Sequence, residues 1–280
     1  MTTLSVPAPA KLNLCLKITG RRDDGYHLLQ SLFQLLDYGD TLHFSAHPSP
    51  EINLTPPFAG VAPADNLIVR AARALQEATG CRMGADIHCD KILPMGGGIG
   101  GGSSNAATTL LALNRLWDTR LGIDTLAEIG LSLGADVPIF VRGRTAWAEG
   151  VGELLCPVEM PQHWYLVIHP GVSVGTREIF SHQQLTRNSR PIRIAAFLEQ
   201  GAGNDCENVV KNLYPEVKNA LDWLTQFAPA QLTGTGSCVF ARFADEASAR
   251  EVFAKRPASY SGFVARGVNR SPSHTALNLN

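Results

Sequence analysis

The sequence PMGGGIGGGSSNAATTLLALNRLW, residues 94–117, joins a dense glycine run to an apolar pattern of helical spacing. Six of the seven residues from Gly96 to Gly102 are glycine. Each glycine loses more backbone freedom on folding than other residues do, so such a run needs a reason. Its N–H groups can point at phosphate oxygens, and Ser103, Ser104 or Asn105 can cap the helix whose positive end faces them. The segment predicts a phosphate-binding loop between a strand and a helix, with a hinge or a tight turn as the alternative.

Two common phosphate-binding motifs fit this segment poorly. A Walker A loop ends in Gly-Lys-Ser/Thr, whereas Ser103 follows glycine with no lysine between them. A G-x-G-x-x-G match can be placed on the glycines, but the acidic residue expected about 20 positions on is missing from a strand tip. Asp118 falls instead near the expected end of the helix. The sequence therefore favours neither a P-loop nor a dinucleotide-binding fold.

Periodic patterns on both sides of the loop predict an α+β protein. Residues 11–18 alternate polar and apolar side chains and precede GRRDDGY, which favours a hairpin. Strands are predicted at 28–36, 41–46, 85–89, 145–158 (with a turn), 164–171, 238–243 and 262–269. Helices are predicted at 66–80, 106–117, 124–133 and 246–255, with Asp65 and Asp124 as candidate N-caps. Two or three helical stretches, including 215–227, are predicted between the strands at 164–171 and 238–243. Residues 28–36 also have helical spacing. We expect a sheet covered by helices, in two domains, 1–160 and 161–280.

Composition limits the partners that this chain can have. It has 280 residues and 45% hydrophobic content, which allows a sizeable core. Its 24 basic and 25 acidic residues leave a formal net charge of -1, so no general electrostatic attraction to nucleic acid or an anionic membrane is expected. Six widely spaced cysteines without a C-x-x-C pair predict neither a zinc site nor disulfides. The start does not read as a signal peptide and no apolar run reaches about 18 residues, so we expect a cytoplasmic protein.

Three segments resemble the motifs of the GHMP kinases, the superfamily of galactokinase, homoserine, mevalonate and phosphomevalonate kinases. PAPAKLNLCLKI at residues 7–18 resembles the first motif, the glycine-rich loop the second, and LTGTGSCVFARF at residues 232–243 the third. The resemblance implies a two-domain GHMP kinase fold, with an N-terminal domain related to the second domain of ribosomal protein S5 and a ferredoxin-like C-terminal domain. It also implies that the chain uses ATP and Mg²⁺.

Two further segments resemble one group of these enzymes, the kinases of 4-diphosphocytidyl-2-C-methyl-D-erythritol in the non-mevalonate pathway of isoprenoid biosynthesis. GRRDDGYH at residues 20–27 and GADVPIF at residues 134–140 carry this similarity. It implies a transferase that phosphorylates the 2-hydroxyl of this small molecule, giving the 2-phosphate and ADP. Two alternatives are a GHMP kinase for homoserine, mevalonate or another small alcohol, and a catalytically inactive sensor with the same fold. The presence of both Lys11 and Asp136 argues against a sensor, which has no need of a proton-handling pair.

The resemblance also assigns roles to residues. Asp136 would take the proton of the acceptor hydroxyl, and Lys11 would be its catalytic partner. The nucleotide would contact Asn66, Lys91, Pro94, Met95, Gly96, Gly97, Gly98, Ile99, Gly100, Gly101, Gly102, Ser103 and Ser104. The acceptor would contact Asn13, Tyr26, His27, Phe33 and Phe180, with cytosine stacked between Tyr26 and Phe180. The polar loop at residues 233–237 would fold over the site.

Each of these residues also has a plain structural interpretation. Asp136 suits a loop or a helix cap, and an isolated lysine such as Lys11 suits a solvated strand edge. Asn66 and Ser103 suit helix caps, and the aromatic side chains suit a packed core. The loop at residues 233–237 suits a tight turn before a strand. No residue pattern predicts the metal ligands or an oligomeric state.

Overall fold

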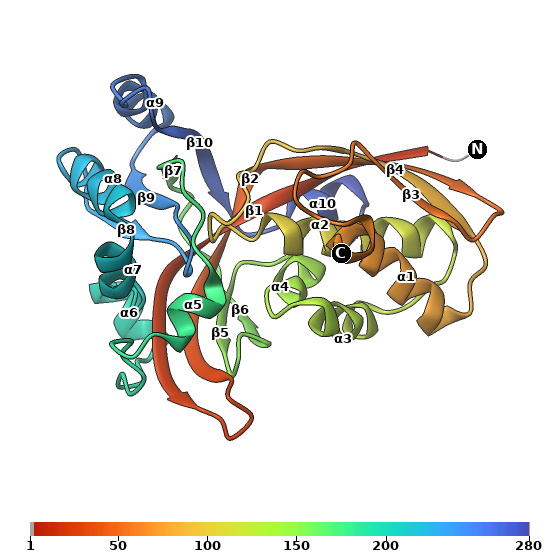
Figure 1. Cartoon of the computed structure of the whole chain (residues 1–280), viewed down its shortest axis with the longest axis horizontal. Coiled ribbons are helices and arrows are strands. Elements are labelled where there is room, and N and C mark those ends of the chain that lie inside the picture. The colour runs from red at the N-terminus through yellow and green to blue at the C-terminus, as the bar shows by residue number, and fades with distance from the viewer. Residues whose placement is uncertain (1–2, 280) are drawn as a thin grey trace.

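A long antiparallel hairpin, β1 (Thr3–Arg21) and β2 (His27–His47), runs across most of the molecule (Figure 1). The structure is a computed structural model and describes residues 3–279. The turn between the two strands contains the Gly and Asp residues that predicted it. Residues 28–36 and 41–46, predicted as separate strands, are parts of the single strand β2. The first of three register shifts between these strands follows Pro9, where two steps along β1 oppose four along β2, so the extra residues lie in β2 between Leu35 and Gly39.

The remaining elements divide between the two halves of the chain. The first half contains β3 (Ile52–Thr55), the 3₁₀ helix η1 (Pro63–Asp65), α1 (Leu67–Thr79), β4 (Gly84–Asp90), α2 (Gly101–Leu116), α3 (Ile123–Leu133), α4 (Val137–Arg142), β5 (Ala146–Glu149) and β6 (Leu154–Pro157). The second half contains β7 (Trp164–His169), α5 (Thr176–Ser181), α6 (Ile194–Gln200), α7 (Glu207–Leu213), α8 (Pro215–Thr225), β8 (Ala230–Leu232), β9 (Val239–Phe243), α9 (Glu246–Ala254), β10 (Ser261–Val268) and α10 (Pro272–Ala276). Four helices thus lie between β7 and β8, where two or three were predicted.

The strands form one sheet in the order β3-β4-β2-β10-β7-β9-β8, with β1 paired to β2 and with β5 paired to both β2 and β6. The pair β3 and β4 is parallel, and the other strand pairs are antiparallel. β10 connects the two halves, because its first part pairs with β7 and its last two residues pair with β2. β10 therefore joins the strands of the two halves into one continuous sheet.

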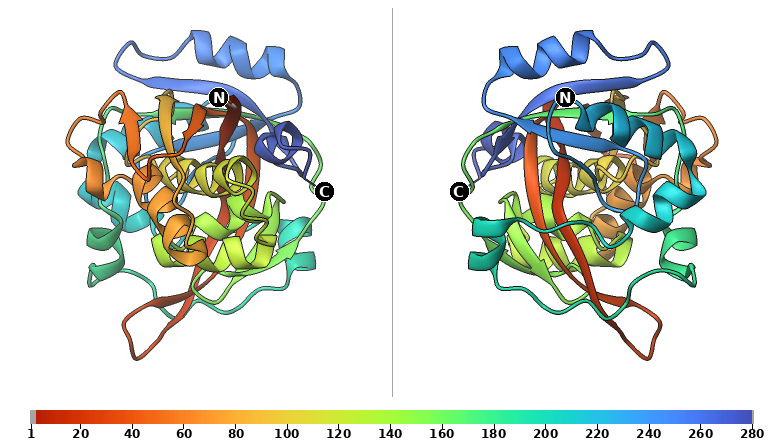
Figure 2. Two further views of the ribbon diagram at one scale, coloured as in Figure 1. Left: turned by 90° about the vertical axis from the view of Figure 1, so that its right-hand side faces the viewer. Right: turned by 90° about the vertical axis from the view of Figure 1, so that its left-hand side faces the viewer.

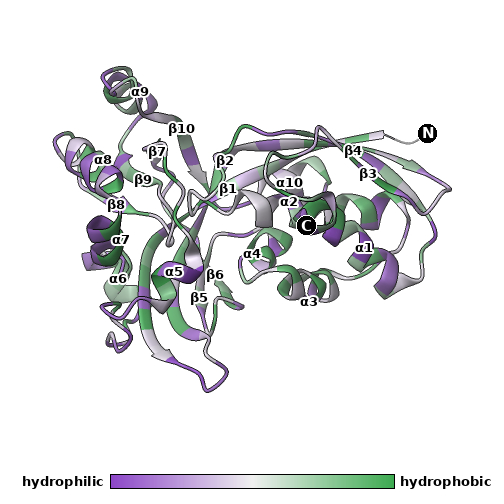
Figure 3. Ribbon diagram, viewed as in Figure 1, coloured by the Kyte–Doolittle hydropathy of each residue, from purple (hydrophilic) through white to green (hydrophobic). Residues whose placement is uncertain are grey.

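Two large apolar clusters lie on either side of this connection. In the first, the helical stripe of α1 (Ile68, Ala71, Leu75) is buried against α2 and the sheet, as its spacing predicts. The second is built around β7, α7 and α8. Figure 3 shows apolar residues along the strands and hydrophilic residues at the hairpin tip. Each half therefore buries its own core.

The hairpin itself contributes to both cores. Val6 of β1 belongs to the first cluster, whereas Leu16 and Ile18 belong to the second. Asp205, before α7, reinforces the second contact because it accepts hydrogen bonds from Lys17 Nζ at 2.7 Å and from the backbone N–H of Ile18 at 2.8 Å. Figure 2 shows the tip of the hairpin projecting beyond the helices at the end opposite α9. One strand thus stabilises both halves.

Two predicted helix caps are wrong. Asp65 ends η1, and Asn66 is the N-cap of α1, where its Oδ1 accepts the N–H of Ile68 at 2.9 Å. Asp124 lies in the first turn of α3 and pairs with Arg142 at 2.8 Å, while Gly122 holds the cap position. A short polar residue near a helix start can serve either purpose, so spacing alone does not fix the cap.

No helix within residues 3–279 is long and apolar enough to cross a lipid bilayer. The cytoplasmic location and the domain boundary after residue 160 stay predictions.

Candidate active site

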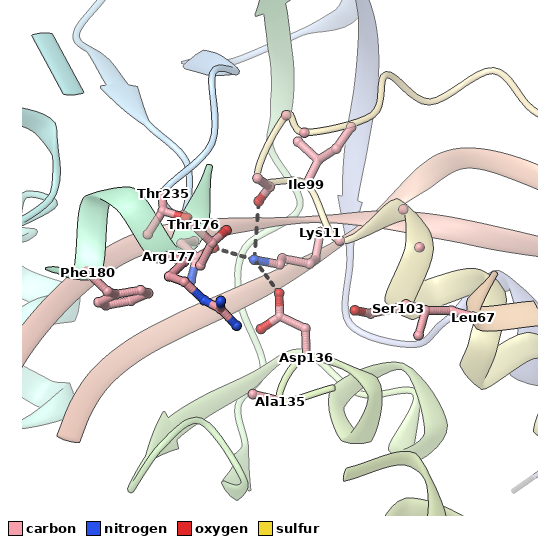
Figure 4. A pocket seen from close by; sticks show the side chains of 18 of the residues that line it. Lys11, Leu67, Ile99, Ser103, Ala135, Asp136, Thr176, Arg177, Phe180 and Thr235 are labelled. Atoms are coloured by element: carbon pink, nitrogen blue, oxygen red, sulfur yellow. Dashed lines mark hydrogen bonds and ion pairs between the residues drawn. The ribbon is translucent and has the colours of Figure 1, made fainter. Parts of the chain in front are cut away.

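A cavity of about 1010 Å³ opens where the hairpin, the glycine-rich loop and the N-terminal ends of α4 and α5 meet. This volume lies at the upper end of that of ligand pockets and leaves room for two small ligands side by side. Figure 4 shows that its side chains come from segments far apart in the sequence, including Lys11 of β1, Asp136 before α4 and Arg177 of α5.

Alternate glycines of the loop adopt left-handed backbone conformations. The φ angle is 70° at Gly96, 74° at Gly98 and 75° at Gly100, a region that favours glycine. Alternation of this kind can turn successive N–H groups toward one concavity, which is the geometry of an anion-binding nest. The residues from Gly96 to Gly102 line the cavity. The glycines are therefore needed for the left-handed backbone conformations and also for the close approach of a ligand to the backbone.

The prediction that a residue within 103–105 caps the following helix is wrong. α2 begins at Gly101, and left-handed Gly100 is its N-cap without a side-chain hydrogen bond. The first helical N–H to find a partner is that of Ser104, which donates to the carbonyl of Gly100 at 2.8 Å. The three N–H groups before it have no partner within the helix. These donors start at the cavity wall, where the positive end of the helix dipole favours an anion.

The glycine-rich loop is packed directly on the loop at residues 233–237. Cys238 donates its N–H to the carbonyl of Gly97 at 3.0 Å. A Cβ atom at Gly236 would lie 2.0 Å from the backbone nitrogen of Gly98, so the two loops approach closer than side chains allow. The loop is also a tight turn, since Thr233 donates its N–H to the carbonyl of Cys238 at 3.1 Å. The tight-turn interpretation is thus confirmed, Gly234 and Thr235 line the cavity, and a role of the loop over the site stays a prediction.

Lys11 and Asp136 form an ion pair in the cavity. Lys11 Nζ lies 3.2 Å from Asp136 Oδ2, and the lysine side chain is 3% exposed against 36% for the aspartate. Nζ also donates to Asn13 Oδ1 and, at 3.3 Å, to the carbonyl of Gly98. It lies 5.0 Å from the centre of the Phe33 ring, which adds a cation–π contact. Lys11 is therefore a fixed buried charge and not a solvated strand-edge residue.

Asp136 is the N-cap of α4, but its side chain makes no capping hydrogen bond. The carboxylate is left to meet Lys11 and the cavity (Figure 4). The C-terminal end of α4 is anchored by α10, because buried His274 hydrogen-bonds through Nε2 to the carbonyl of Val141 at 2.8 Å. A helix that is held at one end presents the carboxylate at the other.

Asp40, which the sequence does not single out, organises the start of the glycine-rich loop. Its fully buried carboxylate pairs with Lys91 Nζ at 2.8 Å and accepts the N–H groups of Ile92 and Leu93, each at 2.8 Å. Asn105 of α2 donates to the same carboxylate at 3.0 Å. A buried carboxylate is costly unless it is paired and hydrogen-bonded in this way. Lys91, expected beside the nucleotide, lines the cavity while held by this ion pair.

The opposite end of the cavity carries aromatic side chains. The rings of His27 and Phe180 stack with centres 5.1 Å apart and planes inclined by 24°. Tyr26, at the end of the hairpin turn, is 62% exposed and lines the cavity. An aromatic side chain that is this exposed is not packed in the core. The structure thus groups three of the side chains predicted to contact the acceptor.

Arg187 determines which nitrogen of the neutral His27 ring carries the proton. Its Nε donates to His27 Nε2 at 3.1 Å, and its remaining donors reach the carbonyls of Phe180, His182 and Leu185. Because a guanidinium only donates, Nε2 must accept and the proton of the neutral ring must be on Nδ1. Burial lowers the pKa of His27 below 6.5, and the charges of Arg187 and Arg21 lower this pKa further.

The structure brings the predicted site residues together around one cavity, with one exception. Ser104, expected to contact the nucleotide, is fully buried and does not line the cavity. It sits one residue past Ser103 on a helix, which turns its side chain to the core-facing side. The additional lining residues that lie outside the quoted motifs include Phe58, Val61, Leu67, Val151, Thr176 and Arg177. They come from loops and from the first turns of α1 and α5.

Comparison with known proteins shows which family this chain resembles. Residues 66–144 match the family model "GHMP kinases N terminal domain", and residues 183–262 match "GHMP kinases C terminal". A 4-diphosphocytidyl-2-C-methyl-D-erythritol kinase of Mannheimia succiniciproducens is 56% identical over 275 residues, which cover 98% of this chain and 91% of the relative. The kinase of the same name from Ectopseudomonas mendocina is 58% identical over 274 residues, covering 98% and 94%.

Solved structures agree with the sequence relatives. A crystal structure of 4-(cytidine 5'-diphospho)-2C-methyl-D-erythritol kinase superposes with a TM-score of 0.83 at 32% identity, covering 95% of this chain and all of the other. Homoserine kinase from Cytophaga hutchinsonii shares the fold, with a TM-score of 0.70 at 16% identity over 97% of this chain and 96% of that one. The chain belongs to the GHMP kinases and, among them, to the family of 4-diphosphocytidyl-2-C-methyl-D-erythritol kinases.

Proposed function

We propose that this chain transfers the γ-phosphoryl group of ATP to the 2-hydroxyl of 4-diphosphocytidyl-2-C-methyl-D-erythritol, giving the 2-phosphate and ADP on the non-mevalonate route to isoprenoid precursors. The observation that carries the proposal is the Lys11–Asp136 pair inside the large cavity. Figure 4 places this pair between Phe180 on one side and Ser103 on the other. Relatives named for the same acceptor support the choice of substrate.

The pair suits the proton transfer that phosphorylation of an alcohol requires. Asp136 would accept the hydroxyl proton while the oxygen forms a bond to the γ-phosphorus and the bond to the bridging oxygen of ADP breaks. Lys11 would stabilise the negative charge that develops on the attacking oxygen. Its hydrogen bonds to Asn13 and to the carbonyl of Gly98 fix its position before the substrates arrive.

The glycine-rich side of the cavity would hold the nucleotide. The first N–H groups of α2, which have no partner within the helix, and the left-handed glycines suit the phosphates, while Asn66 and Lys91 line the same cavity. Mg²⁺ prefers oxygen ligands and usually binds through the phosphates together with one or two protein groups. The Ser103 hydroxyl and the Asp136 carboxylate are the oxygen donors that fit this role. When bound, the ion would neutralise charge on the transferring phosphate.

The aromatic side of the cavity would hold the cytidine of the acceptor. Tyr26 and Phe180 offer faces for stacking, and the Nδ1–H of His27 offers a donor to the acceptor atoms of the cytosine edge. Asn13 lines the cavity and accepts a hydrogen bond from Lys11 Nζ, and it would reach the sugar alcohol. The ring of Phe33 packs against the ammonium group of Lys11.

The direct test measures ADP release by the purified protein with MgATP and each of four acceptors. We expect turnover with the diphosphocytidyl compound and none above background with homoserine, mevalonate or galactose. Turnover with another of these alcohols would keep the kinase chemistry and discard the cytidine pocket. ATP binding without turnover of any acceptor would support an inactive sensor and contradict the proposal.

A further inference from the structure

Arg177 is a cation in the cavity that none of the sequence motifs includes. It lies on the first turn of α5, and Figure 4 shows its side chain extending toward the Lys11–Asp136 pair. Among residues 3–279, its guanidinium has no hydrogen-bond partner within 3.5 Å and no carboxylate within 4.0 Å. Five N–H donors therefore face the cavity unused.

The other lysine and arginine side chains along the described cavity wall are already committed. Lys11 pairs with Asp136, and Lys91 pairs with the buried Asp40. Arg21 donates through Nε to the carbonyl of Gly25 at 3.2 Å. Two substrates with five phosphate groups between them would bring far more negative charge than these engaged groups offset. Arg177 is the wall cation best able to bind an incoming anion.

The position of Arg177 on its helix defines which anion this would be. Arg177 and Phe180 are three residues apart, so they lie on the same face of α5, and both line the cavity. Phe180 stacks on His27 in the aromatic region. Toward the other side, Figure 4 shows Lys11 and Asp136 beyond the guanidinium. Along the cavity, the aromatic ring comes first, the guanidinium second and the catalytic pair third. A diphosphocytidyl alcohol has its base, its diphosphate and its alcohol in the same order.

The backbone that carries Arg177 is held from three directions. Thr176 accepts a hydrogen bond from Thr235 Oγ1 at 2.9 Å, which ties the start of α5 to the loop packed on the glycine run. Glu178 accepts a hydrogen bond from the hydroxyl of Tyr214, and Ile179 is fully buried. Glu178 is thus engaged outside the cavity and does not neutralise its neighbour. The arginine stem starts from a fixed point while its head stays free.

We propose that Arg177 binds the diphosphate bridge of the acceptor and contributes to its specificity. This inference rests on the proposed function, because it assumes that cytidine occupies the aromatic region. A guanidinium recognises phosphate through two parallel N–H···O bonds, which a lysine ammonium does not reproduce. Arg177 therefore distinguishes acceptors that carry a diphosphate from simple alcohols of similar size.

Binding of cytidine 5'-diphosphate and of cytidine, measured by calorimetry without ATP, separates the charge contact from base recognition. Arg177→Gln is expected to weaken cytidine diphosphate binding about tenfold and to leave cytidine binding within about twofold. Arg177→Lys should fall between the two proteins. Arg73→Gln, an exposed arginine of α1 outside the cavity wall, serves as the matched control and should bind both ligands as the unaltered chain does.

Kinetics then separate this role from contact with ATP. The Arg177→Gln enzyme should show a KM for the diphosphocytidyl acceptor raised about tenfold, with the KM for ATP changed less than about twofold. Unchanged binding of cytidine diphosphate, an equal loss for both ligands, or a raised KM for ATP alone would overturn the inference while the unaltered enzyme still turned over its acceptor. Failure of the unaltered enzyme to bind cytidine diphosphate or turn over the acceptor would overturn the proposed function itself.

Discussion

Asp136 and Lys11 differ in the freedom that the fold leaves them. The lysine is surrounded by Asn13, Phe33 and the backbone of Gly98, whereas the aspartate has one strong contact and is open to the cavity. The open partner can meet a substrate hydroxyl, and the enclosed partner can only tune the charge around it.

This difference predicts a selective loss in the Asp136→Asn enzyme. The amide keeps the size of the carboxylate but does not take the hydroxyl proton, so kcat should fall about a thousandfold. The dissociation constant for MgATP, measured by calorimetry, should change less than about threefold, because the nucleotide is proposed to bind mainly through the glycine-rich loop. Asp124→Asn, at an exposed ion pair of α3, is the control and should keep full turnover. Near-normal kcat in the Asp136→Asn enzyme would remove the proposed base.

His27 gives a prediction for pH dependence. Its pKa is lowered from 6.5 by burial and by Arg187 and Arg21, so its ring stays neutral at a pH where an exposed histidine would be half protonated. The KM for the acceptor should therefore stay constant as the pH falls to 6.5 and rise only below it, when the Nδ1–H donor is joined by a charged Nε2–H that opposes Arg187.

Two variants identify the group that titrates. His27→Asn should lack this rise in KM, and any rise that persists belongs to the phosphates or to another residue. Arg187→Met removes a positive charge from the ring, so the pKa of His27 should increase and the rise should begin at a higher pH. A rise at the same pH in the Arg187→Met enzyme would contradict the coupling between the two residues.

Residues such as Arg187, Asp40 and Arg177 show where the sequence is silent about the site. Arg187 and Asp40 each act through a partner far along the chain, Arg187 on His27 and Asp40 on Lys91, and Arg177 lies outside every motif. Such pairs have no local spacing that a sequence pattern can reveal. Lys11 and Asp136 lie in motifs of a known family, and the resemblance already implies that they act as a pair. The structure adds the geometry of their contact.

At the scale of elements, the glycine-rich loop and the loop at residues 233–237 act as one unit. The first provides N–H groups, and the second supports it through backbone contacts at Gly97 and Gly98. Sheet register matters too, because β8 and β9 must pair correctly to bring this turn to the cavity.

Gly236→Ala tests this unit. The added Cβ would lie 2.0 Å from the nitrogen of Gly98 and 2.2 Å from the carbonyl carbon of Gly97, so the backbones must separate. We expect a melting temperature lowered by several degrees and a KM for ATP raised at least about tenfold. Gly122→Ala is the control, because nothing lies within 4 Å of its Cβ position and its φ is -69°. Unchanged stability and KM in the Gly236→Ala enzyme would show that the loops do not depend on each other.

Element prediction succeeded where a periodic pattern is long and failed where contacts between segments decide. The apolar spacing of α1 and the alternation within β1 identify those elements. The unbroken β2 depends on its pairing with β1, and β3, β8 and α10 are too short to carry a period. Helix caps were misplaced for the same reason, since Gly100 caps α2 only because the loop needs a left-handed residue there.

The whole molecule is organised around a hairpin that belongs to both cores. β1 contributes Val6 to one apolar cluster and Leu16 and Ile18 to the other, and β10 pairs with strands of both halves. Loss of either core would therefore expose apolar side chains of the same strand. The two halves should lose their structure together.

Chemical unfolding of the Trp147→Phe/Trp164→Phe/Trp223→Phe enzyme tests this coupling. The remaining tryptophan, Trp117, lies in the first apolar cluster, whereas far-UV circular dichroism follows helices in both halves. The midpoints from fluorescence and from circular dichroism should coincide, as expected for one cooperative transition. Separated midpoints, in this variant and in the unaltered chain alike, would show that the halves unfold independently.

The close contact between Gly98 and Gly236 also limits the mutations that these two positions can accept. A single-base change in the first or second position of a glycine codon specifies either a residue with a Cβ atom or a stop. At Gly236 any such atom meets the backbone of the glycine-rich loop, and at Gly98 it meets the carbonyl of Thr233 at 2.4 Å. Every missense mutation at these two codons therefore strikes the same contact, which leaves the two loops no route of gradual change by single substitutions.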